Sequence, residues 1–424
     1  MIGSASFRDK DYAVLGLARS GLATVKALAG SGARVMAWDG KEEARSAAAP
    51  FARIADPLVT SIYGFEAVVV SPGVPLNKHP IAERARAAKV PVIGDIELFA
   101  QARAEQPPHQ VVGITGTNGK STTTALIHHI LKTAGMPAAM GGNIGLPILE
   151  QDPLPEGGVY VLELSSYQID LTQSLDCDVA VLLNVTPDHL DRYDGIEDYA
   201  ASKARLFAMQ SEDHIAVIAA EDDYTRAIAG EVSGRKMIVS SADVRDQSRW
   251  PSLQGPHNAQ NAAAAVAVAR ALGVSDDKIA EGLATYPGLP HRMERVAEKN
   301  GVLFVNDSKA TNPDSTAPAL GAYPHIHWIL GGLAKGEDLD ACLPYLGNVR
   351  GAYVIGDAAP LFAQLLAGKV PVNESGTLDQ AVRDAAAAAV AGEVVLLSPA
   401  CASFDQFKDY EARGEAFRTA VEAL

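Results

Sequence analysis

Three times along the chain, a short apolar segment with high β-propensity runs into a glycine turn and then into a helical stretch. These segments are YAVLG from Tyr12, VVGITG from Val111 and IHWILGG from Ile326. A strand followed by a tight turn and a helix is the repeating unit of α/β nucleotide-binding folds. The pattern therefore predicts three α/β units in succession.

Two proline-containing stretches mark the expected boundaries between these units. In QARAEQPPHQ the pair Pro107 and Pro108 interrupts a helical pattern, and TYPGLPHRM, around Pro287 to Met293, follows a short amphipathic helical stretch. A chain of 424 residues is also too long for one ordinary core. We expect domains at residues 1–106, 107–288 and 289–424.

The middle segment contains two apolar runs of strand length, VYVLEL at 159–164 and VAVLLNV at 179–185. Uniformly apolar strands are typical of a parallel sheet that is buried on both faces. In such sheets, ligands bind beyond the carboxyl ends of the strands. The alanine-rich run 262–271 predicts a tightly packed helix, because alanine has the highest helix propensity.

Composition narrows the class of protein without fixing its activity. Apolar residues make up 48% and charged residues 21%, which favours a packed globular chain over a disordered one. The formal charge of -15 opposes a nucleic-acid reader, which needs a basic face. The cysteines Cys177, Cys342 and Cys401 are odd in number and widely spaced, which suits reduced thiols. With neither a secretion signal nor a membrane-length apolar run, we expect a cytoplasmic protein.

The strongest chemical signal is a glycine-rich loop between a strand and a helix. Its residues are Gly116, Thr117, Asn118, Gly119, Lys120, Ser121 and Thr122. Glycines let backbone N–H groups turn toward phosphate oxygens, the lysine adds charge, and Ser121 can ligate Mg²⁺. Ile114 stands where the general P-loop pattern has its first glycine. The loop nevertheless predicts a cradle for ATP.

Further motifs follow the loop in a distinctive order. They are GGNIGLP (141–147), ELSSYQ (163–168), NVTPDHLDRY (184–193), YAASKARLF (199–207) and GPHNAQNAAAA (255–265). Together with TGTNGKST they resemble the Mur ligase superfamily, which also contains folylpolyglutamate synthases. The resemblance implies an N-terminal Rossmann-like uridine-binding domain, a central P-loop ATPase-type domain with a parallel sheet, and a C-terminal Rossmann-like amino-acid-binding domain.

Two motifs of the third expected domain select a branch of that superfamily. DSKATNPDST (307–316) and LSPACASFDQFKDYEARG (397–414) resemble the D-glutamate-adding members. The diaminopimelate- or lysine-adding members typically show D-Y-A-H-N-P and D-N-P-R, and the D-alanyl-D-alanine-adding members D-S-Y-N-A-N-P. The resemblance implies that ATP, D-glutamate and UDP-N-acetylmuramoyl-L-alanine react through an acyl phosphate in peptidoglycan synthesis. We also expect a monomer.

The expected catalytic residues are Lys120, Glu163, His189 and Lys203. Glu163 ends an apolar strand, where its carboxylate can face the phosphate loop and hold Mg²⁺. His189 lies in the loop after the next strand, where a histidine can bind a second metal. An ammonium group cannot ligate a cation. The resemblance implies that Lys203 is carbamylated and thereby joins Ser121, Glu163 and His189 around two Mg²⁺ sites.

The resemblance also assigns binding residues to each domain. The UDP-substrate residues are Arg19, Ser20, Asp39, Gly73, Asn143, Ser165 and Gln168. Further ATP residues are Asn258, Asn261, Arg292 and Asp307, on both sides of the second boundary, so domain closure is expected. D-Glutamate carries two carboxylates, for which cations and hydroxyls are needed; Lys309, Thr311, Lys335, Ser403 and Tyr410 are expected to bind it.

Three other readings remain open on the sequence. A regulatory or transport NTPase would use the same phosphate loop but leaves ELSSYQ and DSKATN unexplained. Another Mur-type or folylpolyglutamate-type amide ligase would differ in the amino acid that stimulates phosphate release. A nicotinamide oxidoreductase is the weakest reading, because Ala18 departs from the G-x-G-x-x-G pattern and an ATP cradle follows.

Overall fold

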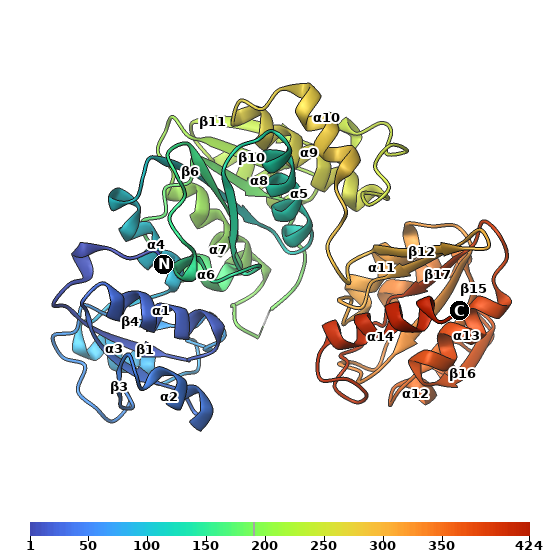
Figure 1. Cartoon of the computed structure of the whole chain (residues 1–424), viewed down its shortest axis with the longest axis horizontal. Helices are drawn as coiled ribbons and strands as arrows, with labels where there is room; N and C mark the ends of the chain where they lie inside the picture. Colours follow the sequence, from blue (N-terminus) through green and yellow to red (C-terminus); the bar gives the residue numbers. More distant parts are fainter. Residues whose placement is uncertain (190) are drawn as a thin grey trace. The chain divides into compact units, whose positions relative to one another are not determined.

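The computed structural model describes residues 1–189 and 191–424 and separates into two compact units. The first unit comprises Met1–Asp243 and Gln260–Leu283, and the second comprises Val244–Ala259 and Ala284–Leu424. The first unit contains two sheets and the second contains one, each with helices packed against it (Figure 1). The predicted α/β fold built on three sheet-and-helix parts is confirmed.

The N-terminal sheet of the first unit is parallel, with strand order β3-β2-β1-β4-β5. Its strands are β1 (Asp11–Leu15), β2 (Arg34–Trp38), β3 (Arg53–Ile54), β4 (Ala67–Val70) and β5 (Val92–Ile93), and its helices are α1 (Arg19–Gly30), α2 (Glu42–Ala48), α3 (Ile81–Ala88) and α4 (Asp95–Ala102). The chain order reverses between β1 and β4, which is where parallel sheets form ligand crevices. The loops after these two strands therefore share one edge of the sheet.

The central sheet is also parallel, with order β11-β10-β9-β6-β8-β7. Its strands are β6 (His109–Thr115), β7 (Ala138–Gly142), β8 (Gly158–Glu163), β9 (Val179–Leu182), β10 (Ile215–Ala219) and β11 (Arg235–Val239). The associated helices are α5 (Lys120–Thr133), α6 (Ser166–Asp170), α7 (Ile196–Ala208), α8 (Asp223–Glu231), α9 (Pro256–Ala271) and α10 (Asp276–Thr285). The alanine-rich helix is thus confirmed within α9.

One predicted strand is longer than the strand that forms. The run 179–185 is a strand only to Leu182, so the prediction was wrong for its last three residues. The reason is a hydrogen bond to the phosphate loop, in which the Asn184 carbonyl accepts from the Thr117 backbone N–H at 2.9 Å. The chain turns there to contact the phosphate loop instead of extending the ladder. The predicted strand 159–164 is confirmed as β8, one residue shifted.

The sheet of the second unit has the order β12-β13-β17-β14-β15-β16, with only the β12–β13 pair antiparallel. Its strands are β12 (Glu294–Lys299), β13 (Val302–Asn306), β14 (Ile326–Gly331), β15 (Val349–Ile355), β16 (Val372–Gly376) and β17 (Val394–Leu397). Its helices are α11 (Pro313–Gly321), α12 (Ala359–Leu366), α13 (Leu378–Ala388) and α14 (Tyr410–Glu422). The loops after β13, β17 and β14 lie side by side because these strands are neighbours.

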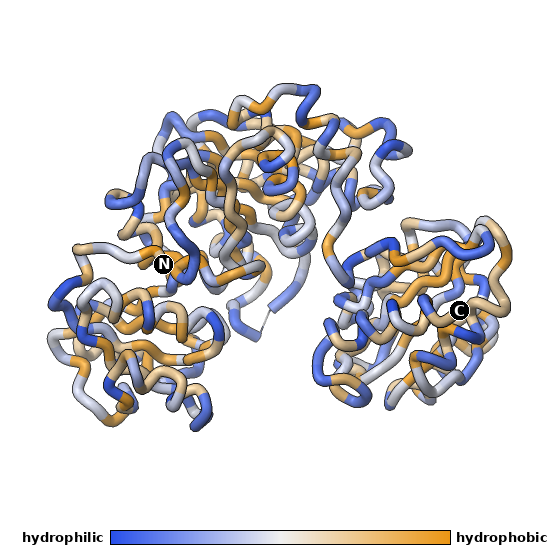
Figure 2. Tube along the Cα trace, viewed as in Figure 1, coloured by the Kyte–Doolittle hydropathy of each residue, from blue (hydrophilic) through white to orange (hydrophobic). Residues whose placement is uncertain are grey.

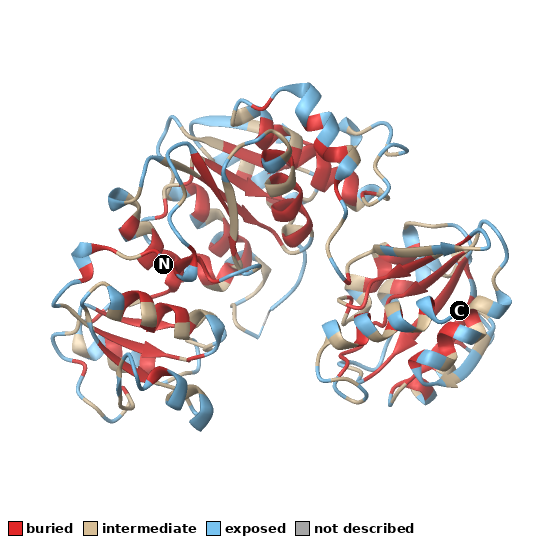
Figure 3. Ribbon diagram, in the orientation of Figure 1, coloured by how far each residue is buried: buried red, intermediate tan, exposed pale blue. Residues whose placement is uncertain are grey.

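Burial explains why these segments form strands. Trp328 and Ile329, consecutive in β14, are both fully buried but belong to core clusters on opposite faces of the sheet. The inner strands of each sheet carry apolar residues (Figure 2) and are buried, while helices, loops and the edge strands β11, β12 and β16 supply exposed surface (Figure 3). Among the described residues, no helix combines the length and apolarity needed to cross a membrane.

Candidate functional site

The phosphate loop joins β6 to α5 and is held by its own glycines and by a neighbouring asparagine. Gly116 and Gly119 have φ angles of 151° and 85°, which disfavour L side chains. A Cβ at Gly119 would lie 2.3 Å from Asn261 Oδ1, so only glycine fits there. Asn184 Oδ1 accepts the Asn118 N–H at 2.8 Å, and Asn184 Nδ2 donates to the Asn118 carbonyl at 3.2 Å. The backbone donors of the loop are therefore preorganised.

Lys120 begins helix α5 directly after this loop. Its Nζ donates to the carbonyls of Gly116 at 2.9 Å and Thr117 at 2.8 Å. Ser121 and Thr122, the next residues, are buried in the first turn. An ammonium, a hydroxyl and backbone N–H groups at a helix N-terminus form a site suited to phosphate groups.

Glu163 lies at the end of β8, next to β6 in the sheet. Its side chain is 3% exposed, and Oε1 accepts a hydrogen bond of 3.1 Å from Asn143 Nδ2. Its Oε2 is buried and has no hydrogen-bond partner. A buried carboxylate oxygen that lacks a partner is costly, and a divalent cation would satisfy it. Glu163 therefore fits the donor set that Mg²⁺ prefers.

Lys203, on α7, is buried to 1% exposure in the same unit. Its Nζ donates to the Gly116 carbonyl at 3.0 Å and lies 4.3 Å from the centroid of the Tyr199 ring. Burial lowers the pKa of Lys203 well below its usual value, and the charge of Lys120 lowers it further. The structure thus brings Lys203 to the phosphate loop in surroundings that favour the neutral amine.

His189 lies in the loop between β9 and α7, with a φ of 56°. Its ring centroid is 5.0 Å from that of Tyr167 and 6.3 Å from that of Tyr199. Burial lowers the pKa of His189, which favours the neutral imidazole that metals bind. Over residues 1–189 and 191–424, no three His, Cys, Asp or Glu side chains gather as a metal cluster. The expected donor set differs from such a cluster because it includes a serine and a lysine.

The residues expected to bind the uridine part lie at the edge where β1, β2 and β4 end. Arg19 starts α1, and its Nη2 donates to the Gly145 carbonyl at 2.9 Å, while Ser20 follows it in the same first turn. Gly73 is exposed, and a Cβ there would meet only open space. The Asp39 carboxylate is already engaged, since Oδ2 accepts from the Leu17 N–H at 2.7 Å and Oδ1 from the Lys41 N–H at 2.9 Å. Although burial alone would raise it, these bonds hold the pKa of Asp39 below its usual value.

The residues expected to face the muramoyl part have structural bonds of their own. The backbone N–H of Asn143 donates to the Glu163 carbonyl at 2.8 Å. Ser165 is the N-cap of α6, and Gln168 completes a capping box with it. Because Gln168 is also only 3% exposed, its side chain holds the start of α6 in place beside Glu163.

The expected ATP residues are divided between the units, with Asn261 in the first and Asn258, Arg292 and Asp307 in the second. In the second unit, Asp307 Oδ2 accepts from Ser398 Oγ at 2.8 Å and Oδ1 accepts from the Met293 N–H at 3.1 Å. Burial raises the pKa of Asp307 to about 7, although the charge of Arg292 opposes the rise. Arg292 Nε is buried without a hydrogen-bond partner.

The residues expected to bind D-glutamate cluster on the loops that follow β13, β14 and β17. Lys335 Nζ donates to Thr311 Oγ1 at 3.1 Å, and Lys309 Nζ lies 5.6 Å from the centroid of the Tyr410 ring. Ser403 is buried, with 2% exposure. Two lysines, two hydroxyl groups and an aromatic ring therefore come from segments far apart in the sequence.

Sequence reasoning missed residues that hold these loops together. Arg413 on α14 is 1% exposed and donates to the carbonyls of Ser308 at 2.8 Å, Cys401 at 3.0 Å and Ala402 at 3.3 Å. Asn184, which brackets the phosphate loop, was also missed. The sequence offered one signal for both residues, because each lies within a motif that carries the resemblance: Asn184 in NVTPDHLDRY and Arg413 in LSPACASFDQFKDYEARG.

Two known protein families match parts of this chain. The family Mur ligase middle domain matches residues 114–251, and the family Mur ligase, glutamate ligase domain matches residues 291–401. Among solved structures, the MurF ligase from Thermotoga maritima in complex with ADP has a TM-score of 0.63 at 18% identity, covering 100% of this chain and 97% of that one. The UDP-N-acetylmuramate-alanine ligase MurC from the same organism has a TM-score of 0.60 at 18% identity, covering 98% and 99%. These similarities support the shared fold.

Three relatives are named UDP-N-acetylmuramoylalanine--D-glutamate ligase. The one from Novosphingobium aromaticivorans is 66% identical and covers 100% of this chain and 97% of its own. Those from Sphingopyxis alaskensis and Zymomonas mobilis are 63% and 59% identical, each with full coverage of both chains. The chain therefore belongs to the Mur ligase superfamily, in the family of UDP-N-acetylmuramoylalanine--D-glutamate ligases.

Proposed function

We propose that this chain is an ATP-dependent ligase that joins D-glutamate to UDP-N-acetylmuramoyl-L-alanine in the cytoplasm, for peptidoglycan synthesis. The observation that carries the proposal is the arrangement around the phosphate loop: Lys120 and Lys203 both donate to the Gly116 carbonyl, and Glu163, with a buried unpartnered oxygen, ends the neighbouring strand. Full-length similarity to relatives with this name supports the choice of substrates.

The proposed reaction has two steps. The carboxylate at the alanyl end of the UDP substrate attacks the γ-phosphorus of ATP, forming an acyl phosphate and releasing ADP. The neutral amine of D-glutamate then attacks the acyl carbon and loses a proton to solvent as the amide bond forms, and phosphate leaves with the electrons of the broken C–O bond. In this scheme the backbone N–H groups of 119–122 and the Lys120 ammonium hold the phosphates in line and offset their charge. Asn258, Asn261, Arg292 and Asp307 would bind the rest of ATP.

Ser121, Glu163, His189 and carbamylated Lys203 would hold Mg²⁺ at two sites beside these phosphates. Bound there, Mg²⁺ would neutralise phosphate charge. For Lys203, the proposed carbamylation is addition of the neutral amine to carbon dioxide, with a C–N bond formed and one proton released to solvent. Support comes from its burial and its depressed pKa, since only the unprotonated amine can add.

The two remaining substrate sites are proposed from location and chemistry. Arg19, Ser20, Asp39 and Gly73 would bind the uridine diphosphate, and Asn143, Ser165 and Gln168 would lie toward the muramoyl part. Lys309, Thr311, Lys335, Ser403 and Tyr410 would bind D-glutamate, since two carboxylates require cations and hydroxyl donors. We also propose domain limits of 1–106, 107–288 and 289–424, supported by the three separate sheets.

Phosphate release with each amino acid in turn tests the proposal. We expect ATP hydrolysis to require both UDP-N-acetylmuramoyl-L-alanine and D-glutamate, and to be abolished in Lys120→Ala. Lys132→Ala is the matched control, because Lys132 is exposed in the last turn of the same helix. Full activity with L-glutamate or L-lysine in place of D-glutamate would refute the assignment.

A further inference from the structure

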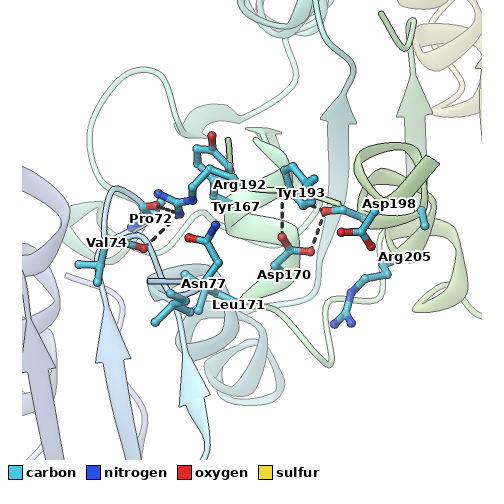
Figure 4. A pocket seen from close by; sticks show the side chains of 13 residues that line it. Pro72, Val74, Asn77, Tyr167, Asp170, Leu171, Arg192, Tyr193, Asp198 and Arg205 are labelled. Carbon is cyan, nitrogen blue, oxygen red and sulfur yellow. Dashed lines mark hydrogen bonds between the residues drawn. The ribbon is translucent and has the colours of Figure 1, made fainter. Parts of the chain in front are cut away.

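Arg192 connects two loops of the first unit that the proposed reaction uses separately. It belongs to the loop after β9, three residues beyond His189. Its Nη2 donates to the carbonyl of Val74 at 3.1 Å and to that of Pro72 at 3.4 Å, in the loop after β4 that carries Gly73. Figure 4 shows the guanidinium reaching these carbonyls at one side of a cavity of about 410 Å³.

The same connection is made in the opposite direction by a second residue. Asn77 Nδ2, from the loop after β4, donates to the carbonyl of Asp191 at 3.1 Å. Each loop thus donates to the backbone of the other. Backbone carbonyls are fixed by the course of the chain, so these bonds constrain where the two loops lie relative to each other.

Tyr167 links this contact to His189. The Arg192 guanidinium carbon lies 4.1 Å from the centroid of the Tyr167 ring, and that ring centroid is 5.0 Å from the His189 ring. Tyr167 lies in the first turn of α6, two residues after its N-cap Ser165. A planar guanidinium can stack on an aromatic ring and donate hydrogen bonds at its edge, which an ammonium cannot do.

We propose that Arg192 is a positioning residue that couples occupancy of the uridine diphosphate site to the placement of His189 for metal binding. The inference rests on the proposed function, in which the Gly73 loop binds the uridine part and His189 a metal. Nucleotide binding that orders residues 72–74 also orders Arg192, which bonds their carbonyls. Through Tyr167, Arg192 then orders the imidazole of His189. By linkage, metal binding then tightens nucleotide binding by the same factor.

Mn²⁺ binding, followed by the paramagnetic resonance signal of the free ion, tests the coupling without turnover. The second probe is UDP-N-acetylglucosamine, which keeps the uridine diphosphate but lacks the carboxylate end that would reach the metal. We expect the sugar nucleotide to tighten Mn²⁺ binding at least about fivefold in the wild type. The tightening should fall toward onefold in Arg192→Lys, and partly in Asn77→Ala, whose exposed side chain can be removed without affecting folding.

Arg205→Lys is the matched control, because Arg205 lines the same cavity but donates to the Thr172 carbonyl. In Arg205→Lys, UDP-N-acetylglucosamine should tighten Mn²⁺ binding as much as in the wild type. In turnover, Arg192→Lys should raise the KM for UDP-N-acetylmuramoyl-L-alanine and the Mg²⁺ half-saturation together, leaving the KM for D-glutamate unchanged. Wild-type tightening in both Arg192→Lys and Asn77→Ala would overturn this inference while leaving the ligase assignment intact. A wild type without D-glutamate-dependent phosphate release would overturn both.

Discussion

Among the described residues, each of the two units contains one fully buried lysine or arginine, and burial affects the two side chains differently. Lys203, beside the phosphate loop, makes a hydrogen bond to the Gly116 carbonyl, and burial lowers its pKa well below the usual value. Arg413, beneath the proposed D-glutamate pocket, donates to the carbonyls of three residues, and burial lowers its pKa only to about 10. Equal burial therefore favours the neutral amine in one unit and leaves a charged guanidinium in the other.

The difference follows from the chemistry of the two side chains. A lysine amine can lose its proton when burial removes water, and it can then react. A guanidinium keeps its proton and distributes several donors in a plane, so it can bond several carbonyls at once. In the proposed function the first unit would use its buried lysine for chemistry, whereas in the second unit Arg413 bonds the carbonyls of residues 308, 401 and 402 and so holds them near one another.

The largest expected effect is the loss of turnover on removing the reactive amine. Lys203→Ala should lower kcat roughly a thousandfold, because the carbamate that holds Mg²⁺ would be missing, and with it the neutralisation of developing phosphate charge. Short carboxylic acids should restore part of the rate by occupying the space of the carbamate. Phosphate release measured with and without such acids checks this. Arg205→Ala, an exposed change two residues along α7, is the control, and an unchanged kcat in Lys203→Ala would remove the proposed metal-bridging role.

Stability should change in opposite directions at the two cations. Arg413→Met should lower the free energy of unfolding by about 3 kcal/mol, because several buried carbonyls lose their donor. Lys203→Met, in metal-free and carbonate-free buffer, should leave stability unchanged or raise it. Denaturant unfolding followed at neutral pH measures both, and the comparison fails if both variants are destabilised equally.

The direction of the Lys203 pKa shift also predicts how the stability of the protein depends on pH. The folded pKa of Lys203 lies below its unfolded pKa, so between these two values the folded state binds fewer protons than the unfolded state. Stability of the wild type therefore rises with pH up to the ordinary lysine value of about 10.4. The advantage of Lys203→Met should shrink over that range.

These two regions also differ in how far the sequence predicts them. The phosphate loop could be predicted because glycine, lysine and serine act there through backbone geometry and neighbours in sequence. The end of β9 could not, since it depends on bonds between Asn184 and a loop 66 residues away. Arg413 could not be singled out either, because its partners lie 12 and 105 residues distant, and only the strand order brings them together.

The smallest expected effect concerns a histidine–glutamate pair at the other end of the second unit's sheet. His327 Nε2 lies 2.9 Å from Glu393 Oε2, near the beginning of β14, whereas the D-glutamate loops follow its end at Gly331. The backbone N–H of Val390 and then the His327 ring lower the pKa of Glu393. The stabilisation is thus present above the unfolded pKa of about 4.3 and is lost as the pH falls through the lower folded value.

Glu393→Gln should accordingly cost about 1 kcal/mol at neutral pH, since glutamine keeps an acceptor oxygen for the Val390 N–H and the His327 ring, and the cost should disappear in acid. Denaturant unfolding across pH 3 to 7, roughly the range over which a glutamate titrates, measures the change. The KM for D-glutamate should equal that of the wild type, because the loops proposed to bind it follow the opposite ends of β13, β14 and β17. A raised KM for D-glutamate would mean that a change of charge far from these loops still alters D-glutamate binding. The effect of Arg413 could then not be assigned to the loops it bonds alone.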